Sequence, residues 1–186
     1  MNSPTPAVEL VAVLCVAPNS TYHQMPNARC YDKHRNAMTF KGDRPVVAHP
    51  PCRAWSAYTA HQAKPEPGEK ELGLACAAWL RTCGGVLEQP AHSRLFAAAG
   101  LPLPNESSGA LWTIEVDQSW WGTPTAKRTW LCFSHVPRSG VRCPLTLRAR
   151  GGDHRRWQLL SHAARSATPP AFAAWLLAIA KLSNRD

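Results

Sequence analysis

Residues Pro45–Ser56 read Pro-Val-Val-Ala-His-Pro-Pro-Cys-Arg-Ala-Trp-Ser. The apolar residues 45–48 predict a short buried strand, and the consecutive prolines that follow cannot continue a sheet ladder. A strand that stops in this way delivers Cys52 to the carboxyl edge of a sheet, where open α/β folds bind their ligands. We therefore predict that Cys52 is a nucleophile. The alternative is a buried cysteine that serves as a small hydrophobic residue.

Three other short segments predict further strands. Val8–Val16 is almost continuously apolar, which is typical of a strand buried in a parallel sheet. Ala28–Tyr31 predicts a second strand ending at Asp32, and Gly85–Pro90 predicts one that carries Glu88 near its end. The sequence thus places a second chemically useful group at a strand tip.

The remaining pattern completes an α/β domain. Apolar residues at i, i+3 and i+4 predict a helix over Glu69–Cys83, which Gly84-Gly85 ends. A final helix is expected through Leu182, with Thr168 as its N-cap. The other expected elements are short helices over Ala91–Ala99 and Asp153–Ala164 and strands over Leu111–Val116 and Arg128–Phe133. Residues 1–186 are expected to form a single domain.

Composition favours a nucleic-acid partner. The 186 residues carry a formal net charge of +9, and the chain has eight tryptophans. Cations hold phosphates while aromatic rings stack on bases, although many basic faces are simply solvated. Arginines concentrate in the last third of the chain, among them Arg138, Arg142, Arg148, Arg150, Arg155, Arg156 and Arg165.

The cysteine pattern and hydropathy predict a cytoplasmic protein. The seven cysteines contain no Cys-x-x-Cys pair, so neither a disulfide framework nor a zinc site is indicated. No apolar run is long enough to span a bilayer, and residues 1–7 do not resemble a secretion signal. We expect free thiols, no bound metal and no membrane partner.

Three motifs occur in an informative order. Pro51-Cys52 comes first, Glu88-Gln89-Pro90 second, and Trp121–Thr129 third, reading Trp-Gly-Thr-Pro-Thr-Ala-Lys-Arg-Thr. In this order they resemble the Pro-Cys loop, the Glu-Asn-Val strand end and the Tyr-Gly-Val-Pro-Gln-x-Arg-x-Arg segment of DNA (cytosine-5) methyltransferases. The chain also resembles small phage-borne proteins that share His-Pro-Pro-Cys and Leu-Glu-x-Pro-x-x-Ser.

The resemblance implies a Rossmann-like methyltransferase-type parallel sheet flanked by helices, in reduced form, and it implies a chemistry. A thiolate from Cys52 would add to carbon 6 of a flipped cytosine, and Glu88 would bond ring nitrogen 3. The implied substrate-binding residues are Pro51, Arg53, Ser56, Lys127, Arg128 and Thr129. The implied cofactor is S-adenosylmethionine, with Asp32 and Asn19 as its candidate ligands. Trp55, Trp120 and Trp121 are candidate stacking surfaces for the base.

The chain also departs from that family. The Phe-x-Gly-x-Gly-Gly motif that brings the family's backbone close to the methyl donor has no counterpart around residues 17–22. Only a brief basic segment follows Phe133, where the family inserts a target-recognition domain. We therefore expect selectivity for a DNA sequence to need a separate protein partner.

Three alternatives stay open at this stage. The chain can be a catalytically degenerate module that binds nucleic acid through its basic surface. A zinc-dependent deaminase also uses Pro-Cys and a glutamate, but Trp55 stands where its second cysteine is required. No motif supports a papain-like hydrolase. His49 is expected either to polarise Cys52 or to be satisfied by backbone groups.

Overall fold

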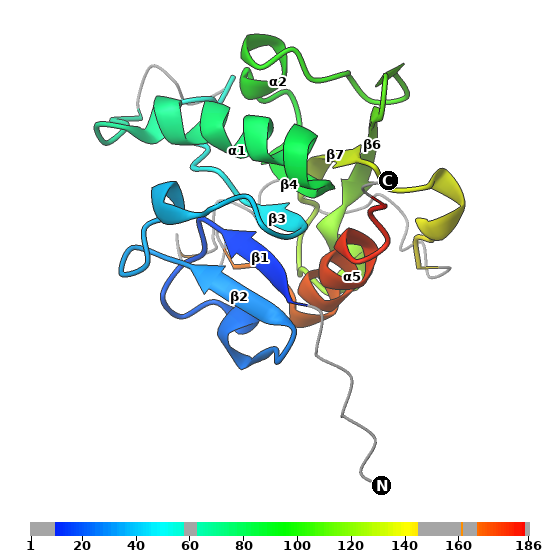
Figure 1. The fold of residues 1–186 in the computed structure, drawn as a ribbon, viewed down its shortest axis with the longest axis horizontal. Helices are drawn as coiled ribbons and strands as arrows, with labels where there is room; N and C mark the ends of the chain where they lie inside the picture. Colours follow the sequence, from blue (N-terminus) through cyan, green and yellow to red (C-terminus); the bar gives the residue numbers. More distant parts are fainter. Residues whose placement is uncertain (1–9, 58–62, 145–160, 162–166, 185–186) are drawn as a thin grey trace, which may run out of the picture.

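One mixed sheet of seven strands forms the centre of the structure (Figure 1). The computed structural model describes residues 10–57, 63–144, 161 and 167–184. The strand order across the sheet is β2-β1-β3-β4-β7-β6-β5. The strands are β1 (Val11–Leu14), β2 (Ala28–Tyr31), β3 (Val46–Ala48), β4 (Gly85–Pro90), β5 (Ser107–Ser108), β6 (Leu111–Asp117) and β7 (Arg128–Ser134).

The half of the sheet that begins at β2 is parallel. Strand β1 pairs in parallel with β2 on one side and with β3 on the other, and β3 pairs in parallel with β4. The chain leaves β1 toward β2 and returns to lie on its other side as β3. In doubly wound sheets, ligands bind beyond the carboxyl ends of the strands at such a reversal.

The other half of the sheet is antiparallel. Strand β7 runs antiparallel to β4 over six residue pairs, and β6 runs antiparallel to β7 over seven. The expectation of a parallel sheet therefore holds only for β1 to β4. The sequence could not show this difference, because strand direction depends on pairing rather than on local pattern.

Helices cover both faces of the sheet. The helices are α1 (Glu69–Cys83), α2 (Leu95–Ala98) and α5 (Pro170–Ala180), with short 3-10 turns η1 (Thr21–Gln24), η2 (Ala37–Thr39), η3 (Gln118–Trp121) and η4 (Arg138–Gly140). Alternate residues of β1 point to opposite faces: Ala12 and Leu14 join the core under α1, whereas Val11 and Val13 join the core under α5. Figure 1 shows α1 and α5 separated by the sheet.

Several sequence predictions match the element bounds. The predicted Glu69–Cys83, Ala28–Tyr31 and Gly85–Pro90 coincide with α1, β2 and β4. Strand β1 is shorter than predicted, because Cys15 takes a left-handed backbone (φ 64°) and ends it.

Other predictions need correction. The N-cap of α5 is Pro169, which makes no side-chain cap, so the prediction of Thr168 as N-cap is wrong. The short helix predicted over residues 91–99 is confined to α2. The helix predicted over residues 153–164 lies outside the described residues apart from Ser161. Within the described ranges, no helix is long and apolar enough to cross a membrane.

Candidate functional site

The loop that carries Cys52 is fixed at the carboxyl end of β3. The backbone N–H of His49 donates to the carbonyl of Leu14 at 3.0 Å, which extends the pairing with β1 by one residue. The side-chain amide of Gln89 donates to the carbonyl of Pro50 at 2.6 Å. The N–H of Trp55 then closes a turn onto the carbonyl of Cys52 at 3.0 Å. Cys52 is an exposed residue on this anchored turn.

Trp55 anchors the same loop to the hydrophobic core. Its side chain is buried and packs into the core beneath α1. A Cβ added to Gly73 of α1 would lie 2.4 Å from the indole nitrogen of Trp55, so only glycine leaves room for the ring. Trp55 is therefore part of the core, and the suggestion that it stacks on a base is corrected.

Glu88 is the centre of a chain of polar side chains. Its Oε2 accepts a hydrogen bond from His49 Nδ1 at 2.9 Å, and His49 Nε2 lies 3.0 Å from the hydroxyl of Tyr22. A carboxylate can only accept, so Nδ1 carries the proton and Nε2 accepts from the phenol when the ring is neutral. His49 is thus satisfied by side chains rather than by backbone groups, and it supports Glu88 rather than contacting Cys52.

The other carboxylate oxygen is held from the antiparallel half of the sheet. Gln118, at the start of η3, donates from Nε2 to Glu88 Oε1 at 3.1 Å and to Thr129 Oγ1 at 3.0 Å. The hydroxyl of Thr129 in turn donates to the carbonyl of Lys127 at 3.1 Å. Strand β7 therefore sets the position of Gln118, and Gln118 helps to position Glu88.

Gln118 also carries a buried polar atom without a partner. The side chain is 1% exposed, yet its Oε1 accepts no hydrogen bond from the described residues. A buried acceptor left unpaired costs about 1–3 kcal/mol.

Electrostatics join Cys52 to Glu88. Partial burial of the thiol and, second, the negative charge of Glu88 raise the pKa of Cys52 above its ordinary value. Lys127 acts in the opposite sense and lowers that pKa. Cys52, Glu88 and Lys127 are therefore near enough to influence one another, and in the resting protein the thiol is neutral at pH 7.

Glu88 is ionised in the same state. Burial alone would raise the pKa of this carboxyl group, but its hydrogen bond with His49, the charges of His49 and Lys127, and the Gln118 amide lower it below its ordinary value. The site thus combines a protonated thiol with a carboxylate whose charge acts on it. Such a pair can move a proton from sulfur to carboxylate when a substrate drives the transfer.

The cationic residues take different positions. The guanidinium of Arg53 is paired with Glu66 and Glu69, so its charge is partly neutralised away from the thiol. Arg128 forms a two-point ion pair with Glu115 while half of its side chain stays exposed. Of the basic residues implied by the sequence motif, Lys127 is the one whose charge acts on both Cys52 and Glu88.

The other implied substrate residues divide into surface and interior positions. Pro51 and Ser56 are half-buried on the loop around Cys52, where a bound molecule can reach them. Thr129 has no exposed surface, and its hydroxyl bonds Gln118 and the Lys127 carbonyl. The expectation that Thr129 contacts substrate is corrected: it positions Gln118.

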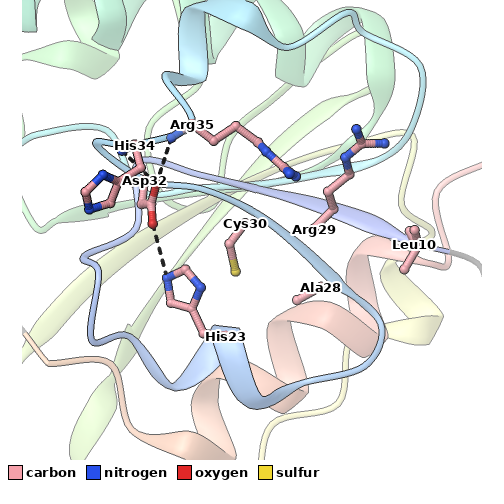
Figure 2. Close-up of a pocket in the computed structure, with 8 residues that line it drawn as sticks. All are labelled: Leu10, His23, Ala28, Arg29, Cys30, Asp32, His34 and Arg35. Atoms are coloured by element: carbon pink, nitrogen blue, oxygen red, sulfur yellow. Dashed lines mark hydrogen bonds and ion pairs between the residues drawn. The ribbon is translucent and has the colours of Figure 1, made fainter.

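The suggested cofactor residues lie beside the parallel edge of the sheet. Asp32 follows β2 and accepts hydrogen bonds from the backbone N–H groups of His34 and Arg35, both at 2.9 Å. It lines a pocket along β2, which Figure 2 shows in close-up. Asn19 is exposed in the turn after β1 and does not line that pocket.

Two tryptophans near the third motif have different surroundings. Trp121 is buried against Phe172 and Trp175 of α5, with ring centroids 4.9 and 4.6 Å away, so it belongs to the core. Trp120 is half-buried and packs on Trp121. Trp120 is therefore the only one of the three suggested stacking residues that keeps an exposed part.

Sequence reasoning missed Tyr22, Gln89 and Gln118. Gln118 lies two residues after the predicted strand Leu111–Val116, so its position near a strand end is a signal that could have found it. Tyr22 and Gln89 gave no comparable signal, because each acts through one side-chain contact that depends on the fold. All seven cysteines are free thiols, and the described part of the chain holds no cluster of three residues able to bind a metal ion.

No protein-family model, curated protein or solved structure matches this chain. The site must therefore be interpreted from its own residues.

Proposed function

We propose that the protein is a DNA base-modifying enzyme of the cytosine-C5 methyltransferase type, with Cys52 as nucleophile and Glu88 as proton carrier. The observation that carries this proposal is that the negative charge of Glu88 in β4 acts on the neutral Cys52 thiol in the loop after the neighbouring strand β3. The parallel order β2-β1-β3-β4, with its reversal between β1 and β3, is consistent with a Rossmann-like methyltransferase sheet in reduced form.

The proposed first step uses the resting protonation states directly. The sulfur of Cys52 forms a bond to carbon 6 of cytosine, and its proton passes to Glu88. Electrons of the C5–C6 double bond shift toward nitrogen 3, which takes the proton from Glu88. The product is an enamine with a nucleophilic carbon 5. Thiol, base and proton balance without an added reactant, and elimination of the thiolate reverses the step.

Gln118 and His49 assist Glu88 in this step. Gln118 donates from Nε2 to Glu88 Oε1 at 3.1 Å and so holds that carboxylate oxygen in position. His49 holds Glu88 Oε2 at 2.9 Å and keeps the carboxylate in place while the thiol proton passes through it. The base must leave the duplex stack to reach these groups, which costs a few kcal/mol.

The methyl donor is a separate prediction. The residues fit S-adenosylmethionine in part, because Asp32 at the end of β2 offers a carboxylate to ribose hydroxyl groups. They lack the glycines that would let the backbone come close to the donor, because the turn after β1 contains none. Fully buried Tyr22 of η1 also occupies the space toward His49. S-adenosylmethionine therefore stays a prediction, and the addition of Cys52 to carbon 6 does not depend on it.

The second candidate is a binding module that has lost its chemistry. The raised pKa of Cys52 favours it, because a catalytic cysteine is usually stabilised as a thiolate in the resting state. The net charge of +9 would then serve to hold nucleic acid. In that case DNA affinity falls with salt and survives replacement of both Cys52 and Glu88 by alanine, because phosphate contacts dominate it.

Covalent capture separates the two candidates. DNA containing 5-fluorocytosine is incubated with the protein in the presence of S-adenosylmethionine and analysed by denaturing electrophoresis. The enzyme proposal predicts an adduct, because fluorine at carbon 5 cannot leave as a proton does, and the adduct maps to Cys52 by mass spectrometry. Cys52→Ser should abolish it. The same amount of adduct with Cys52→Ser would remove Cys52 from this role.

A further inference from the structure

A pocket of about 580 Å³ lies along β2, away from the Cys52 and Glu88 centre (Figure 2). Strand β2 is at the edge of the sheet, since among the described strands it pairs with β1 alone. The volume falls in the range of small-molecule sites, which is about 300–1,000 Å³. The lining residues are Leu10, His23, Ala28, Arg29, Cys30, Asp32, His34 and Arg35.

Two guanidinium groups give this pocket its positive charge. Figure 2 shows the side chain of Arg35 extending above Cys30 in the direction of Arg29, whose own side chain rises from β2. The charge of Arg35 reaches the Cys30 thiol and lowers its pKa, although burial and Asp32 raise that pKa to about 11 overall. Among the described residues, neither guanidinium forms a salt bridge or a hydrogen bond; Arg35 only packs against the ring of Tyr31. Two unpaired guanidinium groups on one wall are suited to bind a phosphate.

The opposite end of the pocket offers an acceptor. Oδ1 of Asp32 accepts two backbone N–H groups, which fixes the carboxylate and lowers its pKa. Oδ2 faces His23 at 3.7 Å, a distance that leaves it free to accept another hydrogen bond. An ionised carboxylate repels a phosphate but accepts from sugar hydroxyl groups. The pocket thus separates an acceptor for hydroxyl groups from donors for an anion.

We infer that this pocket binds a phosphorylated nucleoside. The ribose hydroxyl groups bond Asp32, the phosphate lies between Arg29 and Arg35, and the floor of Ala28 and Cys30 receives the flat base. The same charges disfavour S-adenosylmethionine, because its sulfonium is cationic and it carries no phosphate. The pocket contains neither Cys52 nor Glu88. Nucleotide binding here and base modification at Cys52 are therefore independent proposals.

Isothermal titration of the full chain tests this inference with AMP as the probe. Adenosine, inorganic phosphate and S-adenosylmethionine are titrated in parallel. AMP is expected to bind at least about tenfold more tightly than the three comparators, since charge-assisted hydrogen bonds add to the ribose contacts. No AMP binding at millimolar concentration, or equal affinity for AMP and inorganic phosphate, would overturn it. Tighter binding of S-adenosylmethionine than of AMP would also overturn it, and would instead favour the predicted donor.

Variants locate the site. Arg29→Ala and Arg35→Ala should each weaken AMP binding about tenfold or more, whereas Lys70→Ala, which removes an exposed charge from α1, should not. Asp32→Asn keeps the turn-forming oxygen and should reduce the preference for AMP over inorganic phosphate. Thermal unfolding of each variant confirms that it is folded. Equal AMP affinity in Arg29→Ala, Arg35→Ala and Lys70→Ala would place the ligand elsewhere and refute the assignment.

Discussion

His49 Nδ1 lies 2.9 Å from Glu88 Oε2, and this contact joins the residue after β3 to the fourth residue of β4. Both side chains are only about one-eighth exposed, at 12% and 13%. The pair keeps the carboxylate ionised and fixed in orientation beside Cys52. Most of the testable behaviour of the site follows from this arrangement.

The pH dependence of stability should report on Glu88. Its pKa is lower in the folded protein than the ordinary value of 4.5, so the interaction stabilises the fold above that pH. The contribution is lost as pH falls through the folded-state pKa. Chemical unfolding between pH 6.5 and 3 should therefore show a smaller loss for Glu88→Gln than for the wild type. Parallel curves for the two proteins would contradict the lowered pKa.

The Tyr22 hydroxyl should stabilise the protein through His49. Tyr22→Phe removes a buried hydrogen bond at 3.0 Å and should cost about 1 kcal/mol. Tyr31→Phe is the matched control, because Tyr31 is equally a core residue but its hydroxyl makes no hydrogen bond within the described chain. Urea unfolding measures both. A cost for Tyr22→Phe no larger than that for Tyr31→Phe would mean that the contact with His49 does not stabilise the fold.

Thiol reactivity should reveal the charges around Cys52. Glu88 raises the pKa of Cys52 and Lys127 lowers it, so Glu88→Gln should shift the alkylation profile to lower pH and Lys127→Gln should shift it to higher pH. The rate of iodoacetamide labelling at Cys52, followed by peptide mass spectrometry, gives the profile. Cys143 is exposed and serves as the internal reference in the same sample. Shifts in the reverse directions would show that these charges do not reach the thiol.

The close approach of β3 and β4 depends on Gly85. Its φ is +114°, and a Cβ there would lie 2.1 Å from the carbonyl oxygen of Val46. Gly85→Ala should therefore destabilise the fold by more than about 2 kcal/mol. Gly109→Ala is the control, since its φ is also positive (+58°) but nothing lies within 4 Å of the added atom. Similar melting temperatures for the two variants would contradict the backbone clash.

The sequence predicted the parts of the fold that depend on local pattern. The apolar spacing and the Gly84-Gly85 stop defined α1 correctly, and the proline pair after His49 correctly predicted the end of β3. It also predicted that Cys52 and Glu88 follow or end strands, and the parallel pairing of β3 and β4 brings those strands together. Antiparallel pairing of β4, β7 and β6 was not readable, because it requires contacts between distant segments.

The side-chain network of the site was less predictable. Tyr22, His49 and Gln118 meet Glu88 through rotamers and strand register, which no local pattern specifies. Thr129 fell within a motif and was expected to contact substrate, yet it is buried at a central strand position. Motif matching selected candidate site residues from three separate segments of the chain. The fold was needed to show which of them touch each other.

Hydrogen exchange at carbon 5 of cytosine tests the central claim most directly, because it requires addition of Cys52 but no methyl donor. DNA of mixed sequence is incubated with the protein in D₂O, digested to nucleosides, and deoxycytidine is measured for added deuterium by mass spectrometry. Wild-type protein should introduce deuterium at carbon 5, whereas Cys52→Ser and Glu88→Gln should each lose at least about a hundredfold in rate. No exchange by the wild type, or undiminished exchange by Cys52→Ser, would contradict the account.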